Sequence, residues 1–218
     1  MEKNIFVIKR SGERQPFSPV KIKKVLKWAA EGIEGIDLDK ISNDCQFNYT
    51  TDGITTENLH NSLIEACLDQ ISEETPDYQI VAGRLLNYAL RKKVWGGINP
   101  PRLIDLVRQN VKLGYYDKNI FEKYTTRDIN KINEFIEHDR DLLFAHSGIK
   151  QLIDKYLIQN RETKEIFETP QFAYMLVAMT LFANESNDRL EWIKKAYDNF
   201  SLFKINLATT VIEGARTP

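Results

Sequence analysis

Residues 4–19 read NIFVIKRSGERQPFSP, and this stretch decides how the chain begins to fold. Two short runs of strand-forming side chains, residues 4–9 and 15–17, flank a turn that contains Gly12. Ser18 then offers an N-cap oxygen, and Pro19 suits the first position of a helix. The stretch therefore predicts a β-hairpin that leads directly into a helix.

Apolar side chains at helical spacing continue beyond this point. They predict a first helix with one buried face and a second helix that begins at Thr55 or Thr56. A third helix is predicted with Thr75 as its cap, Pro76 at its first position and two glycines, residues 96–97, after its end. A hairpin and three helices make a compact α+β unit of about 95 residues.

The sequence Asn99-Pro100-Pro101 cannot continue a helix, because proline lacks an N–H and restricts the residue before it. We therefore expect the first domain boundary at this stretch, after residues 1–97. The elements expected after the prolines are helices over residues 102–113, 126–138, 147–155, 170–182 and 188–200, a small hairpin from residues 156–159 and 165–168, and a strand-like run over 203–207. The predicted fold class is α+β and mainly helical.

The composition is that of an ordinary folded chain. Of its 218 residues, 42% are hydrophobic and 28% are charged, which excludes disorder as the main state. The longest nearly apolar stretch, residues 172–183, is too short to cross a bilayer, and the first residues lack the apolar core of a signal peptide. We therefore expect a cytoplasmic protein. The net charge of -1 gives no global attraction to nucleic acid.

Basic side chains are concentrated at the start of the chain. Residues 1–30 hold eight Lys or Arg and two Glu, whereas residues 31–80 hold one Lys and twelve Asp or Glu. This pattern has two interpretations. The basic stretch either docks something anionic, or it is a solvated helix face that meets the acidic segment.

Phosphate binding needs a glycine-rich loop or several cations that converge, and neither a P-loop nor a G-x-G-x-x-G pattern is present. Cations are available for the second route. Lys9 and Arg10 end the first strand, Lys21 opens the first helix, and Lys92 could fold back from the third helix. Thr56, at a helix N-terminus, adds a hydroxyl and a positive dipole end. These residues together form a candidate nucleotide site.

Residues suited to catalysis are scarce. His138 lies among acids and could act as a base, although a charged helix end is the more natural interpretation. His60 could face a bound ligand or solvent. Cys45 and Cys67 have neither C-x-x-C spacing nor a nearby His, so no disulfide scaffold and no metal site is predicted. Cys67 is interpreted as a small core side chain rather than a reactive thiol.

Several motifs together resemble the large (α) subunit of class I aerobic ribonucleotide reductase, of bacterial or phage type. The motifs similar to its amino-terminal ATP-cone are VIKRSG at residues 7–12, WAAEG at 28–32, PDYQ at 76–79 and LRKK at 90–93. The motifs similar to the segment that follows are HDRD at 138–141, ETPQF at 168–172 and GARTP at 214–218. The resemblance implies an ATP-cone over residues 1–97, a helical domain over 98–202 and the truncated start of a catalytic barrel over 203–218.

The resemblance also implies an allosteric site. In the family, ATP favours activity and dATP inhibits it, and Mg²⁺ is expected to accompany the nucleotide. No tightly bound cofactor, metal ligand or catalytic residue is implied within this chain. Thr209 falls where the family holds the substrate diphosphate. The residues implied to bind ATP or dATP are Lys9, Arg10, Gln15, Ser18, Lys21, Ile22, Thr56, His60, Leu63 and Lys92.

The sequence departs from the family pattern at several positions. Gln15 stands where relatives often have a carboxylate, so the preference between ATP and dATP is left open. Ala208 and Thr210 replace prolines that usually flank Thr209, which makes this loop less rigid. The two cysteines match none of the family's catalytic cysteines, and the chain ends before the first cysteine of the redox pair. We therefore expect this chain alone to be unable to reduce a nucleotide.

The partners implied by the resemblance are the remaining part of the large subunit, the radical-generating small (β) subunit and further copies of the complete large subunit. Neither a membrane nor a nucleic acid is implied. The leading hypothesis is an amino-terminal portion of the large subunit, from a truncated or a split gene. The alternative is a stand-alone ATP/dATP-sensing module that docks a partner protein. A cone-bearing repressor is disfavoured for lack of zinc ligands, and nucleic-acid binding by the basic stretch is a further alternative.

Overall fold

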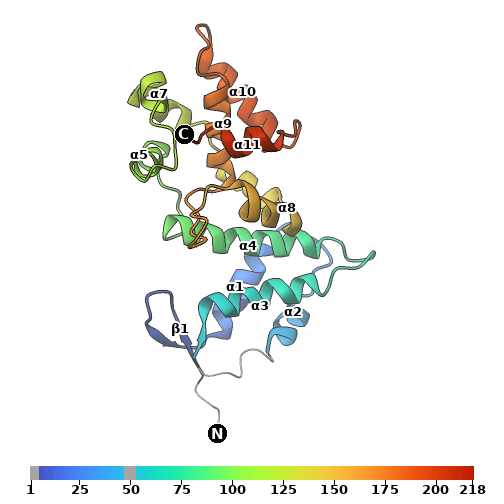
Figure 1. The fold of residues 1–218 in the computed structure, drawn as a ribbon. Coiled ribbons are helices and arrows are strands. Elements are labelled where there is room, and N and C mark those ends of the chain that lie inside the picture. The colour runs from blue at the N-terminus through green and yellow to red at the C-terminus, as the bar shows by residue number, and fades with distance from the viewer. Residues whose placement is uncertain (1–4, 47–52) are drawn as a thin grey trace. The chain divides into compact units, whose positions relative to one another are not determined.

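A computed structural model describes residues 5–46 and 53–218 (Figure 1). The chain packs as two compact units. Unit 1 comprises the residues up to Ala89 together with Leu142–Lys150, and unit 2 comprises Leu90–Asp141 and Gln151–Pro218. One small sheet and many helices confirm the predicted α+β, mainly helical class. The sequence-based division into residues 1–97, 98–202 and 203–218 stays a prediction.

The sheet of unit 1 begins with the predicted hairpin. Strands β1 (Phe6–Ile8) and β2 (Arg14–Pro16) pair antiparallel, with Val7 opposite Gln15. Gly12 takes φ +80°, a conformation that favours glycine, in the turn between the two strands. A third strand, β3 (Ile54–Thr55), pairs parallel to the other edge of β1 and was not predicted. Its two residues are too few to show a period in the sequence.

Within residues 5–46 and 53–95, the structure describes four helices, where the sequence predicted three. The helices are α1 (Pro19–Ala29), α2 (Leu38–Gln46), α3 (Thr56–Leu68) and α4 (Tyr78–Trp95), the last of which continues into unit 2. Helix α2 escaped prediction because its apolar stripe is short. Its fully buried side chains are Ile41 and Cys45.

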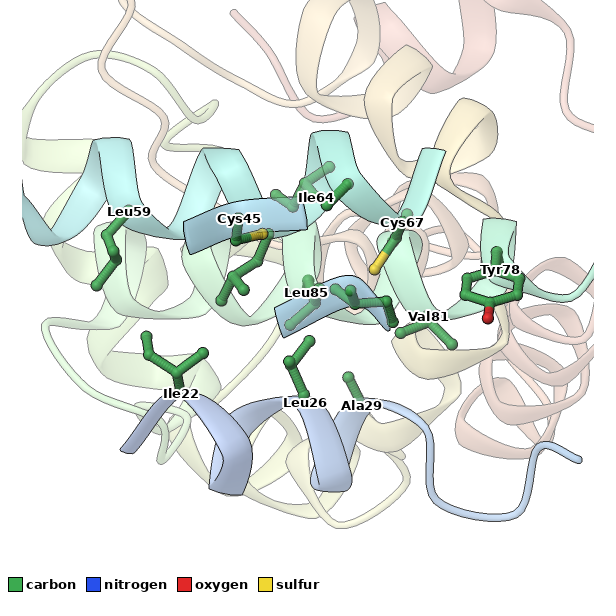
Figure 2. Packing of buried hydrophobic residues seen from close by; sticks show 14 of the residues in the cluster. Ile22, Leu26, Ala29, Cys45, Leu59, Ile64, Cys67, Tyr78, Val81 and Leu85 are labelled. Atoms are coloured by element: carbon green, nitrogen blue, oxygen red, sulfur yellow. The ribbon is translucent and has the colours of Figure 1, made fainter. Parts of the chain in front are cut away.

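The core of unit 1 forms between these helices. Figure 2 shows Ile22, Leu26 and Ala29 projecting from α1 toward the apolar side chains of α3 and α4. Burying such side chains contributes about 1.5–3 kcal/mol each for the larger ones. Cys67 lies in this core, and burial raises the pKa of its thiol to about 12, with the nearby Cys45 adding to the shift. The interpretation of Cys67 as a core side chain is therefore confirmed.

The helix caps differ in part from the prediction. Thr55 caps α3, because its Oγ1 accepts a hydrogen bond of 3.1 Å from the Asn58 N–H. Ser18 occupies the N-cap position of α1, but its side chain makes no capping hydrogen bond. The prediction of Thr75 as a cap was wrong. Its hydroxyl donates to the Gln70 carbonyl at 2.7 Å, and α4 begins only at Tyr78.

Unit 2 is built mostly from helices, and its centre is α9. Ten consecutive residues of α9, from Pro170 to Met179, are buried, and α10 packs along this helix. The elements after the prolines, of which residues 142–150 belong to unit 1, are α5 (Leu103–Lys112), α6 (Ile120–Lys123), α7 (Thr126–Asn133), a 3-10 helix (His138–Leu143), α8 (His146–Gln151), a π-helical turn (Leu152–Tyr156), α9 (Pro170–Leu181), α10 (Arg189–Ser201) and α11 (Thr209–Gly214). Each of the five predicted helices corresponds to one of these elements.

Two predictions for unit 2 were wrong. The hairpin expected from residues 156–159 and 165–168 is reduced to a single bridge between Gln159 and Ile166. The run over residues 203–207 forms no strand, because Phe203 turns the chain with φ +58° and the residues after it are irregular. Within residues 5–46 and 53–218, no helix has both the length and the apolar character needed to cross a bilayer.

The two N-cap positions provide a matched test of this description. We expect Thr55→Ala to lower the free energy of unfolding by about 1 kcal/mol, because the Asn58 N–H loses its acceptor. Ser18→Ala should lower it by less than about 0.5 kcal/mol, because no capping bond is lost. Urea unfolding followed by circular dichroism measures both. Equal losses in the two variants would contradict the assigned capping pattern.

Candidate functional site

The sheet places Lys9 at the start of a helix. In the parallel pairing of β1 with β3, Ile8 lies opposite Thr55, so the next residue along β1, Lys9, comes beside the first turn of α3. Helix α3 begins at Thr56 and is 13 residues long. Its first N–H groups and its dipole present positive potential at this end. A cation and a helix N-terminus therefore lie together in unit 1.

Three of the predicted residues surround one carboxylate, that of Glu13. Gln15 donates from Nε2 to Glu13 Oε1 at 3.0 Å, and Lys9 Nζ lies 3.4 Å from Glu13 Oε2. The hydrogen bond from Gln15, the charge of Lys9 and the charge of Lys21 hold the pKa of Glu13 below its usual value. Lys21 therefore lies on the same side of unit 1 as Lys9. Although Gln15 is uncharged, a carboxylate is still present next to these cations.

The remaining residues at this end have different surroundings. Ser18 accepts a hydrogen bond through its backbone carbonyl from the Lys21 N–H at 3.1 Å. Arg10 is exposed in the hairpin turn. Ile22 and Leu63 are buried in the apolar core, so they contribute packing. A direct contact of either residue with a nucleotide stays a prediction.

His60 faces α4 rather than open solvent. Its Nε2 lies 2.6 Å from the Leu85 carbonyl oxygen, and its ring stacks on Tyr88 with 5.7 Å between ring centroids. Tyr88 also contacts Trp28, at 5.4 Å. The half-buried rings of Trp28, His60 and Tyr88 thus form an aromatic cluster on unit 1. Sequence reasoning missed Trp28 and Tyr88, because only tertiary structure brings α1, α3 and α4 together here.

Lys92 is exposed near the end of α4, four residues or about one helical turn beyond Tyr88. The predicted role of Lys92 as a cation that binds phosphate stays a prediction. This end of α4 belongs to unit 2. Convergence of Lys92 with Lys9 stays a prediction.

Thr209 is the exposed first residue of α11 in unit 2, and its contact with a substrate diphosphate stays a prediction. A buried ion pair holds the segment that carries it. Arg216 pairs with Glu168, and the same carboxylate accepts hydrogen bonds from Tyr116 Oη at 2.7 Å and the Ile158 N–H at 2.8 Å. The GARTP and ETPQF motifs are therefore neighbours in space.

A second buried carboxylate links the HDRD motif to α9. Asp141 accepts a hydrogen bond from Gln171 Nε2 at 2.9 Å, and Arg91 lies 3.8 Å from its other oxygen. Burial raises the pKa of Asp141 to about 7, although Arg91 and Gln171 oppose the shift. The Asp141 carboxyl is thus poised between its charged and neutral forms near neutral pH.

His138 has the opposite shift. Burial, together with the charge of Arg91, lowers its pKa to about 4. Its ring packs edge-on against Phe172 at 4.7 Å and Trp95 at 5.3 Å. The structure therefore favours a packing role over that of a general base. In the part of the chain that the structure describes, no group of three His, Cys, Asp or Glu side chains is arranged to hold a metal ion.

Two families match the chain. The ATP cone domain family matches residues 5–93, and the family described as ribonucleotide reductase, all-alpha domain, matches residues 142–218. The chain is 42% identical over 219 positions to ribonucleoside-diphosphate reductase 1 subunit alpha of Escherichia coli strain K12, which covers 100% of this chain and 29% of that protein. These matches confirm the resemblance predicted from the motifs.

Two further relatives align over nearly the same span. The subunit alpha of Enterobacteria phage T4 is 42% identical over 214 positions, or 98% of this chain and 28% of that protein. The subunit alpha of Helicobacter pylori is 33% identical over 213 positions, or 98% of this chain and 26% of that protein. The chain therefore spans less than a third of the length of these relatives.

The shifted pKa values of Asp141 and His138 predict opposite effects on stability. Folded Asp141 keeps a proton that the unfolded chain releases, so its contribution is lost as the pH rises from about 4 to about 7. Folded His138 stays neutral while the unfolded chain takes up a proton, so its contribution is lost as the pH falls from about 6.5 to about 4. Between about pH 4 and pH 6.5, the effects of Asp141 and His138 on the free energy of unfolding change with pH in opposite directions. They therefore nearly cancel in the unmodified protein.

Single substitutions should reveal how each residue makes the free energy of unfolding depend on pH. Relative to the unmodified protein, the free energy of unfolding of Asp141→Asn should rise with pH between about 4.5 and 6, by up to about 1.4 kcal/mol per pH unit. That of His138→Gln should fall with pH over the same interval. Urea unfolding at several pH values measures both. If the curves of both variants ran parallel to that of the unmodified protein, the assigned protonation states would be wrong.

Proposed function

Because this chain corresponds to the amino-terminal region of a class I ribonucleotide reductase large subunit, with an ATP cone followed by the all-alpha domain, we propose that its cone binds ATP or dATP. The nucleotide acts as the effector that sets the overall activity of the complete reductase. Binding must differ between the two nucleotides, because an effector shifts an equilibrium only through differential affinity for its states.

One arrangement supports this proposal: Lys9 follows the strand that pairs with the start of α3, and the charge of Lys21 acts on Glu13, the ion-pair partner of Lys9. A triphosphate needs several positive groups that compensate for its lost hydration. In the proposed site, the ammonium groups of Lys9 and Lys21 and the first N–H groups of α3 would supply them. Thr56 adds a hydroxyl, and Gln15 adds an amide. Arg10, Ser18, His60 and Lys92 complete the proposed set, with Ile22 and Leu63 beneath it.

The donor set suits a nucleotide carried with Mg²⁺. In the described ranges no cluster of protein ligands could hold the metal alone, so the phosphates would provide most of its coordination. The metal would offset part of the phosphate charge. The rest of the phosphate charge would be offset by Lys9, Lys21 and the N-terminus of α3.

We assign the reduction itself to the complete enzyme, with Thr209 at its substrate site. The partners are the rest of the large subunit, the radical-generating small subunit and further copies of the complete large subunit, in the cytoplasm. In this proposal Cys45 and Cys67 have a structural role, because both are buried in the apolar core. This chain by itself is therefore expected to bind nucleotide without reducing it.

The phosphate contacts are tested by removing single cations. We expect Lys9→Ala and Lys21→Ala each to weaken ATP and dATP binding about tenfold or more, because each removes a charged hydrogen-bond donor. Lys27→Ala is the matched control, since Lys27 is exposed in the last turn of the same α1 helix. Isothermal titration calorimetry measures the Kd values. Unchanged affinity in both site variants would refute the placement of the phosphates.

Removing the charge of Glu13 should strengthen nucleotide binding, whereas removing Lys9 or Lys21 should weaken it. The Glu13 carboxylate repels phosphate and engages Lys9, so Glu13→Gln should tighten ATP binding about threefold at low salt. The difference should shrink at high salt because exposed charges are screened. Glu65→Gln, an exposed acid farther along α3, serves as the control. Weaker binding in Glu13→Gln would show that the carboxylate supports the site rather than opposing it.

A further inference from the structure

Arg84, on α4, joins two segments of unit 1 that are distant in sequence. Its Nη1 donates to the Glu31 carbonyl at 2.7 Å and to the Ala29 carbonyl at 3.1 Å. Its Nε donates to the Leu142 carbonyl at 3.3 Å. One guanidinium therefore holds the end of α1 and the start of Leu142–Lys150, a segment of unit 1.

The contact with α1 is of a kind that stabilises helix ends. Ala29 is the last residue of α1, and Glu31 lies two residues beyond it. Carbonyls at a helix C-terminus lack intrahelical donors and carry partial negative charge, which a guanidinium satisfies. Arginine also provides donors in a rigid planar fork, so the directions of its bonds to two segments are linked.

The neighbouring residue, Gly83, brings Leu142–Lys150 against the backbone of α4. A Cβ atom at Gly83 would lie 2.3 Å from the Phe144 carbonyl oxygen and 3.0 Å from the His146 nitrogen. Such distances exclude a side chain in this arrangement. The segment therefore packs directly on α4 at Gly83, and Arg84 fixes it one residue farther along.

This junction lies between two parts that the sequence assigns to different families. Helix α1 belongs to the ATP cone, which matches residues 5–93, whereas Leu142–Lys150 begins the match to the all-alpha domain at residue 142. Lys21, in the first turn of α1, belongs to the proposed nucleotide site. Because a helix of 11 residues moves as a nearly rigid body, displacement of its first turn also displaces the Ala29 carbonyl.

We propose that Arg84 is a positioning residue that couples nucleotide binding at the first turn of α1 to the segment Leu142–Lys150. The proposal rests on the proposed function, since it requires that the nucleotide contact Lys21. When the nucleotide fixes α1, the guanidinium is fixed with it, and the bond to the Leu142 carbonyl holds the segment in one arrangement. The effect would reach the all-alpha domain without any contact between it and the nucleotide.

Hydrogen exchange with mass spectrometry tests this coupling. In the unmodified chain, saturating dATP should slow amide exchange in residues 142–150 about fivefold or more. In Arg84→Gln, dATP should still bind by calorimetry, but exchange in residues 142–150 should no longer respond to it. Arg108→Gln, which removes an exposed arginine of α5, should leave the response intact.

The outcomes separate the two proposals. Absence of dATP binding to the unmodified chain would overturn the proposed function. Binding without a response in residues 142–150, or a full response in Arg84→Gln, would overturn the coupling alone. If, without nucleotide, amides of α3 exchange faster in Arg84→Gln than in the unmodified chain, the substitution has disturbed the fold. The experiment is then done with Arg84→Lys instead. A lysine keeps the charge but lacks the fork, so at least half of the response should disappear, and a full response would again refute the coupling.

Discussion

The parallel pairing between β1 and β3 brings the first turn of α3 to the end of β1. Only Val7 and Ile8 of β1 pair with Ile54 and Thr55, yet this register sets Lys9 beside the first turn of α3. The Thr55 hydroxyl then begins the helix by accepting from the Asn58 N–H. Since phosphate recognition depends on cations and helix N-termini brought to one place, the proposed effector site depends on this short pairing.

Buried polar groups give unit 2 its specific arrangement. The Glu168–Arg216 ion pair joins segments nearly fifty residues apart, and Asp141 joins the HDRD motif to Gln171 of α9. Burying charge is costly, and a buried pair is tolerated when further hydrogen bonds satisfy its atoms. Glu168 meets this condition through Tyr116 and the Ile158 N–H, whereas Asp141 keeps one oxygen without a hydrogen bond. Burial raises the pKa of Asp141, and the charge of Arg91 and the hydrogen bond from Gln171 offset this shift only in part.

Much of the fold could be read from local pattern. Strong start and stop signals, such as Pro19 at the start of α1 and Gly96 after α4, predicted helix ends to within a few residues. Short or mixed signals failed. Helix α2 offers too few buried positions, β3 has only two residues, and the apolar run after Phe203 resembles a strand although the chain turns there. In each case tertiary contacts outweigh weak local preference.

The sequence alone determined the mainly helical class, the hairpin and the family to which the motifs point, because these depend on side-chain period and on residue identity along the chain. Only the tertiary structure decided which side chains lie close together in space. It set Glu13 among Lys9, Gln15 and Lys21, and it turned His60 toward Leu85 and Tyr88. It also carried Arg84 to the ends of two distant segments. Such neighbourhoods arise when helices pack around a common core, and separation in sequence does not encode the resulting distances.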